Sequence, residues 1–562
     1  MGNSLPREWI PTQKQSTGNI IKDILIYNNI DKKDWGYFLK ATIKDIPRIN
    51  TAYNVDKFIE RVGKAIKNKE RICLYCDYDV DGMTGGSVAY LMLKELGADP
   101  YIFTNDKRKE AYGLNSISLR RLINDMKDLY EGTSLIITID NGISALDGIN
   151  KVINDLKIDI IVTDHHESTM ELPIDIVVDL KQEKDDYEFR EFCGCGLIWK
   201  LLRELYIERG IEEETHKYLD LVALGTIADL VPLVGENRVL VKEGLKIMNK
   251  LERPVFNSFR MFLGAEVITE ETIGFQIAPA LNAQTRINGV ADKSIDALLA
   301  EDNTTASSLV TELIQTNDKR KERTKKEEEI AKEKVIEEGL DKDKIIFMTD
   351  DCFSGGIVGL TAGRIASKYA RPCIVGQEHT DGRVSCSARS YGDFNLFELL
   401  NKYKDEFLSF GGHKMAAGLT FRKSQFKEIK EKLLNDEQTK EFVPVKKYEY
   451  LNEVCPAILT PTFIKQINLL APFGMGFKKP LFKISNLQVP KDSIMYMGQN
   501  NDHIKVTFQG VNIVGWSLKE KMEEMNKGSV QSYDMLVDLS LNTFMGKTTP
   551  QATIIEDNIL AR

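Results

Sequence analysis

The chain has 562 residues, of which 42% are hydrophobic and 28% are charged, and its formal net charge is −9. This length exceeds what one hydrophobic core usually organises, so we expect roughly three to four domains. The negative net charge argues against coating nucleic acid through bulk charge, although a local basic channel remains compatible with it. The first residues lack a basic segment followed by an apolar one, and no run approaches the ~20 apolar residues of a membrane helix. We therefore expect a cytoplasmic protein without a membrane anchor.

The eight cysteines are scattered, with two close pairs at Cys73/Cys76 and Cys193/Cys195. A C-x-x-C pair can bind zinc, but structural zinc takes about four ligands, and no second matching pair follows. Cys73 and Cys76 lie inside the apolar run RICLYCD, which predicts a buried strand. We expect buried, reduced thiols, as in proteins of a reducing compartment.

From Arg71 the sequence alternates between strand-like and helix-like patterns. Apolar runs at 72–76, 134–140 and 158–164 predict buried strands, and the intervening segments have helical periodicity. Such alternation predicts a parallel sheet with helices on its faces. All three runs continue into acidic residues at their carboxyl ends, which is the edge where open α/β sheets bind ligands.

The rest of the chain shows other patterns. A charge-rich stretch with alternating signs predicts an exposed helix that connects two domains. A second, smaller α/β pattern follows it, and short alternating strands near the carboxyl end predict a small antiparallel barrel. The first residues predict a mostly helical extension without a readable motif. The expected domains are therefore 1–70, 71–300, 301–338, 339–440 and 445–562.

Acids and histidines of the first domain concentrate in four segments. These are DYDVDG (Asp77, Asp79, Asp81), TIDNG (Asp140), TDHH (Asp164, His165, His166) and ADL (Asp229). Converging carboxylates repel one another unless cations lie between them. Oxygen and imidazole ligands together suit Mn²⁺ or Mg²⁺. Two such ions about 4 Å apart can clamp a phosphodiester and activate water.

Each segment by itself has a simpler explanation. DYDVDG could be an exposed turn. It does not fit a calcium-binding loop counted from Asp77, because the twelfth position of such a loop would be Val88. The pair His165–His166 could be polar surface, and Asp229 could cap a helix or loop. These explanations do not account for all four segments together, which favours a metal site.

The four segments, with the last extended to GTIADLVPL, resemble in their order the motifs of the DHH phosphoesterase superfamily. NDKRKEAYGLN is similar to the R-x-x-x-x-YG stretch of the RecJ family, and GCGLIWKLL to its G-x-G-x-x-x-KL helix start. SARS (387–390) and SFGGHKMAAG (409–418) resemble the DHH-associated domain. APFGMGFKKPLF and HIKV resemble the carboxyl-terminal OB-type module of RecJ. The resemblance extends from Arg71 nearly to the end.

The resemblance implies an exonuclease that degrades single-stranded DNA from its 5′ end to mononucleotides, with two divalent ions, in DNA repair or recombination. Because histidine ligands favour the softer ion, we expect Mn²⁺ in preference to Mg²⁺. The implied metal ligands are Asp77, Asp79, Asp81, Asp140, His165 and Asp229, with Asp77 as an alternative orienting residue. The implied catalytic residues are His166, His413 and Asp164. The implied substrate-binding residues are Arg108, Asn282, Arg286, Ser387, Arg389, Gly411 and Gly412; Arg108, Arg286, Ser387 and Arg389 resemble a 5′-phosphate pocket.

The chain departs from the RecJ pattern at Ala280, Thr285 and Phe477, where the family tends to have arginine, glycine and asparagine. The first of these departures, Ala280, suggests that the contact with the nucleotide differs from that of the family. Two other functions are open. One is a DHH phosphodiesterase acting on short oligonucleotides or cyclic dinucleotides, and the other is a catalytically silent scaffold. We expect a monomer with single-stranded DNA as its partner, and a single-strand-binding protein or helicase as candidate protein partners.

Overall fold

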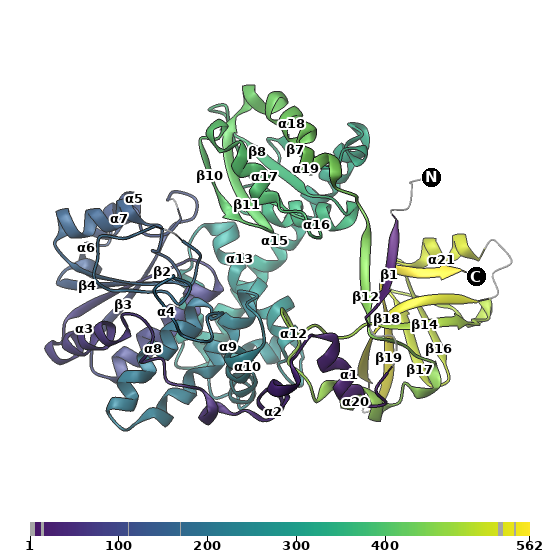
Figure 1. The fold of residues 1–562 in the computed structure, drawn as a ribbon, viewed down its shortest axis with the longest axis horizontal. Helices are drawn as coiled ribbons and strands as arrows, with labels where there is room; N and C mark the ends of the chain where they lie inside the picture. The colour runs from purple at the N-terminus through teal and green to yellow at the C-terminus, as the bar shows by residue number, and fades with distance from the viewer. Residues whose placement is uncertain are drawn as a thin grey trace. The chain divides into compact units, whose positions relative to one another are not determined.

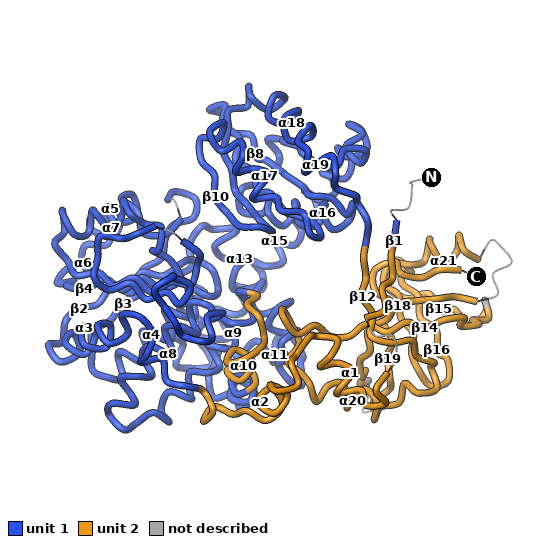
Figure 2. Tube along the Cα trace, in the orientation of Figure 1, with its two compact units in different colours: residues 1–7, 47–229, 243–446 blue, residues 8–46, 230–242, 447–562 orange. Residues whose placement is uncertain are grey.

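The computed structural model describes residues 6–12, 16–110, 112–168, 170–526, 532–544 and 547–561. The chain divides into two compact units (Figure 2). Unit 1 consists of 1–7, 47–229 and 243–446, and unit 2 of 8–46, 230–242 and 447–562. The first 70 residues, expected as one extension, are therefore divided between the units. Helix α3 (Val55–Asn68) packs against α8 (Gly194–Glu208) of unit 1.

The first sheet of unit 1 is fully parallel, as the sequence predicts. Its strand order is β3 (Asp99–Thr104), β2 (Arg71–Cys76), β4 (Thr133–Ile139), β5 (Asp159–Thr163) and β6 (Val177–Val178). Alternate side chains such as Tyr75 and Ile136 join a core with α5 (Ser116–Asn124), α7 (Leu146–Lys151) and the following π-helix (Val152–Leu156). Helices α4 (Val80–Glu95) and α8 pack against the same strands, and α9 (Leu219–Ala228) packs on both helices.

The second sheet of unit 1 is mixed. Its order is β10 (Ser409–His413), β11 (Ala416–Arg422), β9 (Arg383–Arg389), β8 (Cys373–Glu378) and β7 (Ile346–Asp350). Strands β7 and β8 pair in parallel, and the other described pairs are antiparallel. Helix α16 (Val358–Tyr369) packs on β8 and β9, while α17 (Leu396–Lys402) and α18 (Phe426–Asn435) contribute to the other core of this sheet.

A 35-residue helix, α15 (Asn303–Glu337), lies between the two sheets of unit 1 in the chain (Figure 1). The Asp302 side chain caps it by accepting from the first backbone amides. The sequence predicts an exposed connector, but this is wrong for one face, because Val310, Leu313, Ala331 and Val335 are buried. That face packs against α11 (Pro254–Leu263), α13 (Ala278–Asn288), α14 (Asp292–Leu299) and α16. The charged residues between the apolar positions mask this stripe in the sequence.

Unit 2 is built around a seven-stranded sheet. Its order is β13 (Asn452–Glu453), β14 (Phe482–Leu487), β18 (Tyr533–Phe544), β19 (Lys547–Ala561), β17 (Val511–Gly515), β16 (His503–Phe508) and β15 (Met495–Met497). The sequence predicts only antiparallel pairs, yet β17 pairs with β19 in parallel, as β13 does with β14. Helix α21 (Lys519–Met525) follows β17, and the chain then re-enters the sheet through β18, which runs antiparallel to β19, so that β19 has the same direction as β17.

Segments far apart in sequence complete the core of unit 2. Helices α1 (Ile20–Tyr27) and α2 (Trp35–Lys40) contribute Ile24, Leu25 and Phe38 to it, and α20 (Pro461–Asn468) packs beside α1. Phe477 is fully buried, with its ring centroid 4.6 Å from that of Phe38. The departure at Phe477 from the RecJ pattern is therefore a core substitution.

Two further structural features bear on the sequence predictions. Among the residues that the structure describes, no helix is long and apolar enough to cross a membrane. The pairs Cys73/Cys76 and Cys193/Cys195 are buried and free, as expected. Burial raises the pKa of the Cys73 thiol to about 12, so these cysteines are protonated side chains of the core.

Candidate active site

The strand order of the first sheet brings the acidic segments together. Asp77 follows β2, Asp140 follows β4 and Asp164 follows β5, and β4 lies between the other two strands. Carboxyl ends of parallel strands meet at one edge of the sheet, so these three acids share it. Asp140 has a φ of +63°, a left-handed conformation in which aspartate and asparagine are tolerated better than most residues. Asp140 is therefore the central acid of the edge.

The other two acids of the DYDVDG segment are positioned by helix starts. Asp79 is the N-cap of α4, and its Oδ1 accepts from the backbone N–H of Asp81 at 2.9 Å. The Asp81 carboxylate accepts from the backbone N–H groups of Gly194 at 2.6 Å and Cys195 at 2.9 Å, at the start of α8. A Cβ at Gly194 would lie 2.5 Å from the Cβ of Asp140. The G-x-G helix start thus allows α8 to approach the acids closely.

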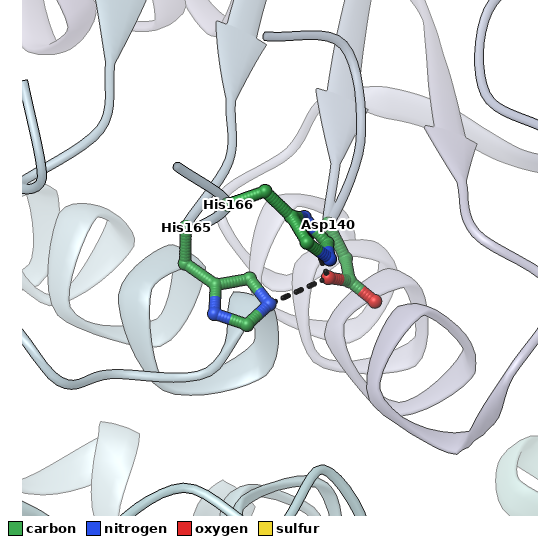
Figure 3. Close-up of side chains that lie close together, drawn as sticks. All are labelled: Asp140, His165 and His166. Carbon is green, nitrogen blue, oxygen red and sulfur yellow. Dashed lines mark hydrogen bonds and ion pairs between the residues drawn. The ribbon is translucent and has the colours of Figure 1, made fainter. Parts of the chain in front are cut away.

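His165 lies between three of the acids. Its Nε2 is 2.9 Å from Oδ1 of Asp140 (Figure 3). The same nitrogen is 3.7 Å from Oδ2 of Asp81 and 3.7 Å from Oδ2 of Asp229, which follows α9. Burial, followed by the charge of His166, lowers the pKa of His165 to about 3. A neutral imidazole is the form that binds a metal ion.

His166 is held differently from His165. Its Nδ1 lies 2.7 Å from Oδ1 of Asp164, whereas Oδ1 of Asp140 is 4.0 Å away. Burial alone would lower the pKa of His166, but the bond to Asp164 outweighs it and raises this pKa to about 9. The other oxygen of Asp164 accepts from the backbone N–H of Ile143 at 2.9 Å. Asp164 therefore orients His166, and none of the metal-type clusters of the described residues includes it.

Each acid at this edge destabilises the ionised form of its neighbours. Burial, followed by the charge of Asp79, raises the pKa of Asp81 to about 6. Burial, followed by the charge of Asp81, raises the pKa of Asp229 to about 8. The same causes raise the pKa of Asp77 and of Asp140 well above their usual range. Cations between these carboxylates would remove this cost.

The donor set fits divalent ions. Within the described part of the chain, three groups have ligand atoms within 4.8 Å of one another, namely Asp81/His165/Asp229, Asp77/Asp79/Asp140 and Asp140/His165/His166. Oδ1 of Asp77 is buried and has no hydrogen-bond partner among the described residues, as expected of an atom that faces a cation. All six sequence-predicted ligands are therefore brought together, and Asp77 belongs to one of the groups. No cysteine takes part in these groups.

A group of basic and small residues of the second sheet forms a candidate phosphate pocket. Arg389 Nη1 donates to Oγ of Ser387 at 2.9 Å on β9. A Cβ at Gly359, in the first turn of α16, would lie 2.8 Å from Nη2 of Arg389. Arg286, near the end of α13, approaches the carbonyl oxygen of Gly356 with Nη1 at 3.5 Å. Three of the four residues expected in the 5′-phosphate pocket are thus close to one another and to a helix start.

The fourth expected residue, Arg108, is exposed, and the structure places its neighbour Lys107 in the pocket region instead. Lys107 Nζ lies 4.9 Å from the ring centroid of Tyr78, and its backbone N–H donates to the carbonyl of Gly289 at 2.8 Å. Burial, followed by the charge of Arg286, lowers the pKa of Lys107 to about 8. Counting back five residues from Tyr112 in R-x-x-x-x-YG also reaches position 107. The motif spacing therefore also favours Lys107 over Arg108 at this position, with lysine in place of arginine.

Tyr112 is a second residue of the site that the sequence reasoning did not assign. Its hydroxyl donates to the carbonyl oxygen of Asp140 at 3.1 Å. Its ring centroid lies 6.2 Å from that of His166 and 6.3 Å from that of Tyr78. The side chain is 53% exposed. The YG dipeptide of the same motif is the feature of the sequence that indicates this residue. In the structure the Tyr112 ring forms a wall of the site.

The GGH segment forms the edge strand β10, which pairs with β11 in a hairpin. Gly412 has a φ of +148°, and a Cβ there would lie 2.4 Å from the carbonyl oxygen of Ala416, whereas Gly411 has open space around it. His413 is exposed on this strand. Partial burial, followed by the charges of Arg389 and His166, lowers its pKa. The imidazole of His413 therefore lies within electrostatic reach of the histidine that Asp164 orients.

Helix α13 carries the remaining positions of interest. Asn282 is half-buried, and its carbonyl oxygen accepts from Oγ1 of Thr285 at 3.1 Å. The described contacts do not connect the Asn282 side chain with the acids or with the arginines. Ala280 and Thr285 are 1% and 3% exposed. These two departures are therefore interior substitutions, and Arg286 keeps its place at the end of the helix.

Residues 71–226 match the model described as the DHH family, N-terminal domain. Residues 342–437 match the DHHA1 domain, and residues 452–556 match the RecJ OB domain. The chain therefore contains a domain of the DHH family, followed by a DHHA1 domain and a RecJ OB domain. The acids lie in the DHH domain except Asp229, which follows its matched range directly. Ser387, Arg389 and His413 lie in the DHHA1 domain, and the OB domain lies in unit 2.

Relatives of this chain include the single-stranded-DNA-specific exonuclease RecJ of Bacillus subtilis, 35% identical over 88% of this chain and 62% of that protein. RecJ of Thermus thermophilus is 29% identical over 81% of this chain and 64% of that protein. The chain thus spans less than two thirds of the length of these two relatives. A crystal structure of the Thermus thermophilus RecJ in complex with Mn²⁺ has a TM-score of 0.78 at 24% identity, covering 96% of this chain and 75% of that one. This last likeness is one of fold.

Proposed function

We propose that this chain is a metal-dependent exonuclease that hydrolyses single-stranded DNA from its 5′ end and releases 5′-mononucleotides. The observation that carries the proposal is the combination, in unit 1, of two groups of metal-type ligands with a pocket of arginines that lack ion-pair partners among the described residues. The names of the RecJ relatives support it. The OB match favours strands over small dinucleotides as substrates, and the complete ligand set disfavours a silent scaffold.

We assign Asp81, His165 and Asp229 to one ion and Asp77, Asp79 and Asp140 to a second, with Asp140 adjoining both groups through its contact with His165. Divalent ions there would polarise the phosphodiester, activate water and stabilise the leaving oxygen. We expect Mn²⁺ to support the reaction better than Mg²⁺ because an imidazole ligand favours the softer ion. The Thermus relative is solved with Mn²⁺ and also with Mg²⁺, so cleavage rates with each ion are the test of this preference.

The remaining side chains position the substrate. Asp164 holds Nδ1 of His166, which leaves Nε2 of that ring to donate to an oxygen of the scissile phosphate. His413 approaches the same phosphate from β10, and Gly411 and Gly412 let the backbone come close to it. Lys107, Arg286, Ser387 and Arg389 receive the terminal 5′ phosphate, which sets the direction of digestion.

We expect a 5′-phosphorylated strand to have a kcat/KM about 10- to 150-fold higher than a 5′-hydroxyl strand, the effect of one charge-assisted contact. This preference should hold below pH 8 and decline above it, because the cationic form of Lys107 binds phosphate and its pKa is about 8. Lys107→Arg should abolish the decline, since arginine does not titrate in this range. The measurement is initial cleavage of 3′-labelled strands with Mn²⁺ across about pH 6.5 to 9.5, a range that brackets this pKa.

The matched control is Lys109→Arg, because Lys109 is exposed and pairs with Asp106 at 3.6 Å in the same loop. This variant should keep the decline of the wild type. Digestion that begins at the 3′ end would refute the proposed polarity. Equal cleavage rates for the 5′-phosphorylated and 5′-hydroxyl strands at neutral pH would contradict the phosphate pocket. If the preference of Lys107→Arg declines with pH as it does in the wild type, another group is responsible for the titration.

Unit 2 offers a surface for the rest of the strand. Trp516 is 52% exposed, and its ring centroid lies 5.0 Å from that of His503. Nearby, Lys519 Nζ lies 5.5 Å from the ring centroid of Tyr496, and its backbone N–H donates to the carbonyl of Asp502. Exposed rings interleaved with cations suit stacking of successive bases without sequence preference. We assign this cluster to binding of single-stranded DNA.

Trp516→Ala should weaken the affinity for a long single strand by about 1–3 kcal/mol, the value of one stacked base. Its cleavage of saturating short oligonucleotides should remain near the wild-type rate, because the proposed ligands lie in unit 1. Fluorescence anisotropy and cleavage of short strands measure the two effects. Tyr37→Ala, at an exposed ring of α2, is the control. A point variant is needed because truncation after Pro444 would remove most of the core of unit 2 from α1 and α2. Unchanged affinity in Trp516→Ala would withdraw the assignment.

The cellular role follows from the proposed reaction. We place this activity in DNA repair or recombination, where single-stranded 5′ ends are degraded, and in the cytoplasm. We also propose that the chain acts as a monomer, and that a single-strand-binding protein or a helicase brings it to its substrate. Sedimentation of the protein with and without such a partner tests both statements.

A further inference from the structure

Among the described cations of unit 1 that are at least partly buried and have no ion-pair partner, four lie close enough for their charges to interact, namely Lys107, Arg286, Arg320 and Arg389. Three of them belong to the proposed pocket for the terminal 5′ phosphate. The fourth, Arg320, lies on the long helix α15 and has no role in that pocket. Partly buried cations without carboxylate partners are costly unless an anion joins them.

Arg286 is the residue that connects the other three. Its charge is the largest electrostatic contribution to the lowered pKa of Lys107, of Arg389 and of Arg320. Lys107 also experiences the charge of Arg389, whereas Arg320 experiences that of Arg364 instead. Arg286 is therefore the charge that Lys107, Arg389 and Arg320 have in common, and α13, which carries Arg286, packs against α15, which carries Arg320.

The neighbours of Arg320 are neutralised, but Arg320 itself is not. Arg364 Nη1 lies 2.6 Å from Oε2 of Glu328, and Arg323 Nε lies 3.5 Å from Oε1 of Glu327. The Nε of Arg320 is buried and has no hydrogen-bond partner in the described structure. A buried guanidinium nitrogen without an acceptor leaves a hydrogen bond available to a ligand.

The charges of the pocket also exceed the demand of one phosphate. A terminal phosphomonoester carries a charge of about −1.5 to −2. Lys107, Arg286 and Arg389 already supply more than this charge, although Asp79 attracts both Lys107 and Arg286. Arg320 is therefore available to a second anionic group that adjoins the first. The planar guanidinium of Arg286, with its five N–H donors, can contact both groups.

We propose that Arg320 and Arg286 form a second phosphate subsite, which receives the β-phosphate of a strand with a 5′-diphosphate or 5′-triphosphate end. This assignment rests on the proposed function, because it takes the 5′ terminus to enter between Arg286 and Arg389. It predicts that the pocket distinguishes pyrophosphate from phosphate even when no DNA is cleaved. The chain would then bind 5′-diphosphate and 5′-triphosphate ends as well as 5′-monophosphate ends.

The first test uses the wild-type protein in metal-free buffer, where cleavage cannot occur. Inorganic pyrophosphate and inorganic phosphate each compete with a dye-labelled, 5′-phosphorylated oligonucleotide, followed by fluorescence anisotropy. We expect pyrophosphate to compete at a concentration at least about tenfold lower than phosphate, the effect of one charge-assisted contact. Equal competition by the two anions would overturn the proposal, whether or not the protein cleaves DNA with Mn²⁺.

The second test compares Arg320→Met with Arg323→Met, which removes an exposed and paired arginine from the same helix. Arg320→Met should reduce the advantage of pyrophosphate to about twofold, whereas Arg323→Met should retain it. Oligonucleotides with 5′-hydroxyl, 5′-monophosphate and 5′-diphosphate ends identify the source of the second phosphate. Of these three strands, only the one with the 5′-diphosphate end should bind more weakly to Arg320→Met than to the wild type. If all three strands weaken equally, Arg320 holds an internal phosphodiester and the proposal is wrong. The proposal would also be refuted if pyrophosphate keeps its full advantage over phosphate in Arg320→Met. The same holds if that advantage is lost to the same extent in Arg323→Met.

Discussion

Asp140→Asn is expected to reduce the turnover of single-stranded DNA by ~10³-fold or more, a loss of about 4 kcal/mol of transition-state stabilisation. Asp140 lies on the central strand of the site and adjoins both ligand groups. Asparagine keeps the oxygen but removes the negative charge that the second ion requires. It also suits the backbone, since Asp140 has a φ of +63°, where alanine would be strained. Single-turnover cleavage with Mn²⁺ measures the effect.

The same variant should not destabilise the metal-free protein. Burial and the neighbouring acids raise the pKa of Asp140 well above its unfolded value. The folded state therefore binds more protons than the unfolded state, and this group costs stability as the pH rises toward neutrality. Asparagine removes that cost, so the melting temperature in chelator should stay level or rise, while the stabilisation by Mn²⁺ should shrink.

The control for this prediction is Asp155→Asn. Asp155 is an exposed acid of unit 1 that lies 3.6 Å from Lys151 Nζ. Its replacement should leave both turnover and the response to Mn²⁺ unchanged. Near-normal turnover of Asp140→Asn, in a folded protein, would contradict the two-ion assignment. A lower melting temperature in chelator would show that Asp140 has a structural role instead.

His413→Ala should reduce turnover by about 10²-fold, while the melting temperature and Mn²⁺ binding remain those of the wild type. The imidazole is exposed on the edge strand β10, so its removal leaves no cavity. The metal-type ligands lie between Asp77 and Asp229, in the DHH domain or directly after it, whereas His413 belongs to the DHHA1 domain. The expected loss is therefore one of phosphate orientation. Single-turnover cleavage, differential scanning fluorimetry and Mn²⁺ titration separate these effects.

His379→Ala is the matched control, because this histidine of the same domain contacts Oγ of Ser385 at 3.0 Å. It should retain full turnover. His413 does not cap a helix, since the GGH segment is a strand of a hairpin. If His413→Ala cleaves at the wild-type rate, the DHHA1 domain does not complete the site and the DHH domain performs the chemistry alone.

The acid cluster could be predicted from the sequence because it depends on local patterns. The apolar runs before Asp77, Asp140 and Asp164 are buried parallel strands, as their composition indicates. Carboxyl ends of such strands share an edge, so the acids that follow them must converge. The role of Asp164 could not be predicted fully from the sequence. Only the structure shows that its carboxylate lies 2.7 Å from Nδ1 of His166 and so orients that ring.

The basic pocket could be predicted only in part. Lys107 and Arg108 are adjacent cations in a loop, and composition does not decide which of them points inward. The bond from the Lys107 backbone to Gly289, far along the chain, places one side chain over Tyr78 and leaves the other exposed. The neighbourhood of Arg320 and Arg286 likewise depends on the packing of α13 against α15.

The sequence by itself determined the parallel sheet, the acids at its edge and the order of the domains, because strand periodicity and helix periodicity arise from neighbouring residues. Tertiary structure alone decided the division of the first 70 residues between two units, the buried face of α15 and the parallel pairing of β17 with β19. It also decided which of the described cations lack partners. These properties depend on contacts between distant segments, and the free energy of such contacts comes from apolar area and charge that the chain brings together only on folding.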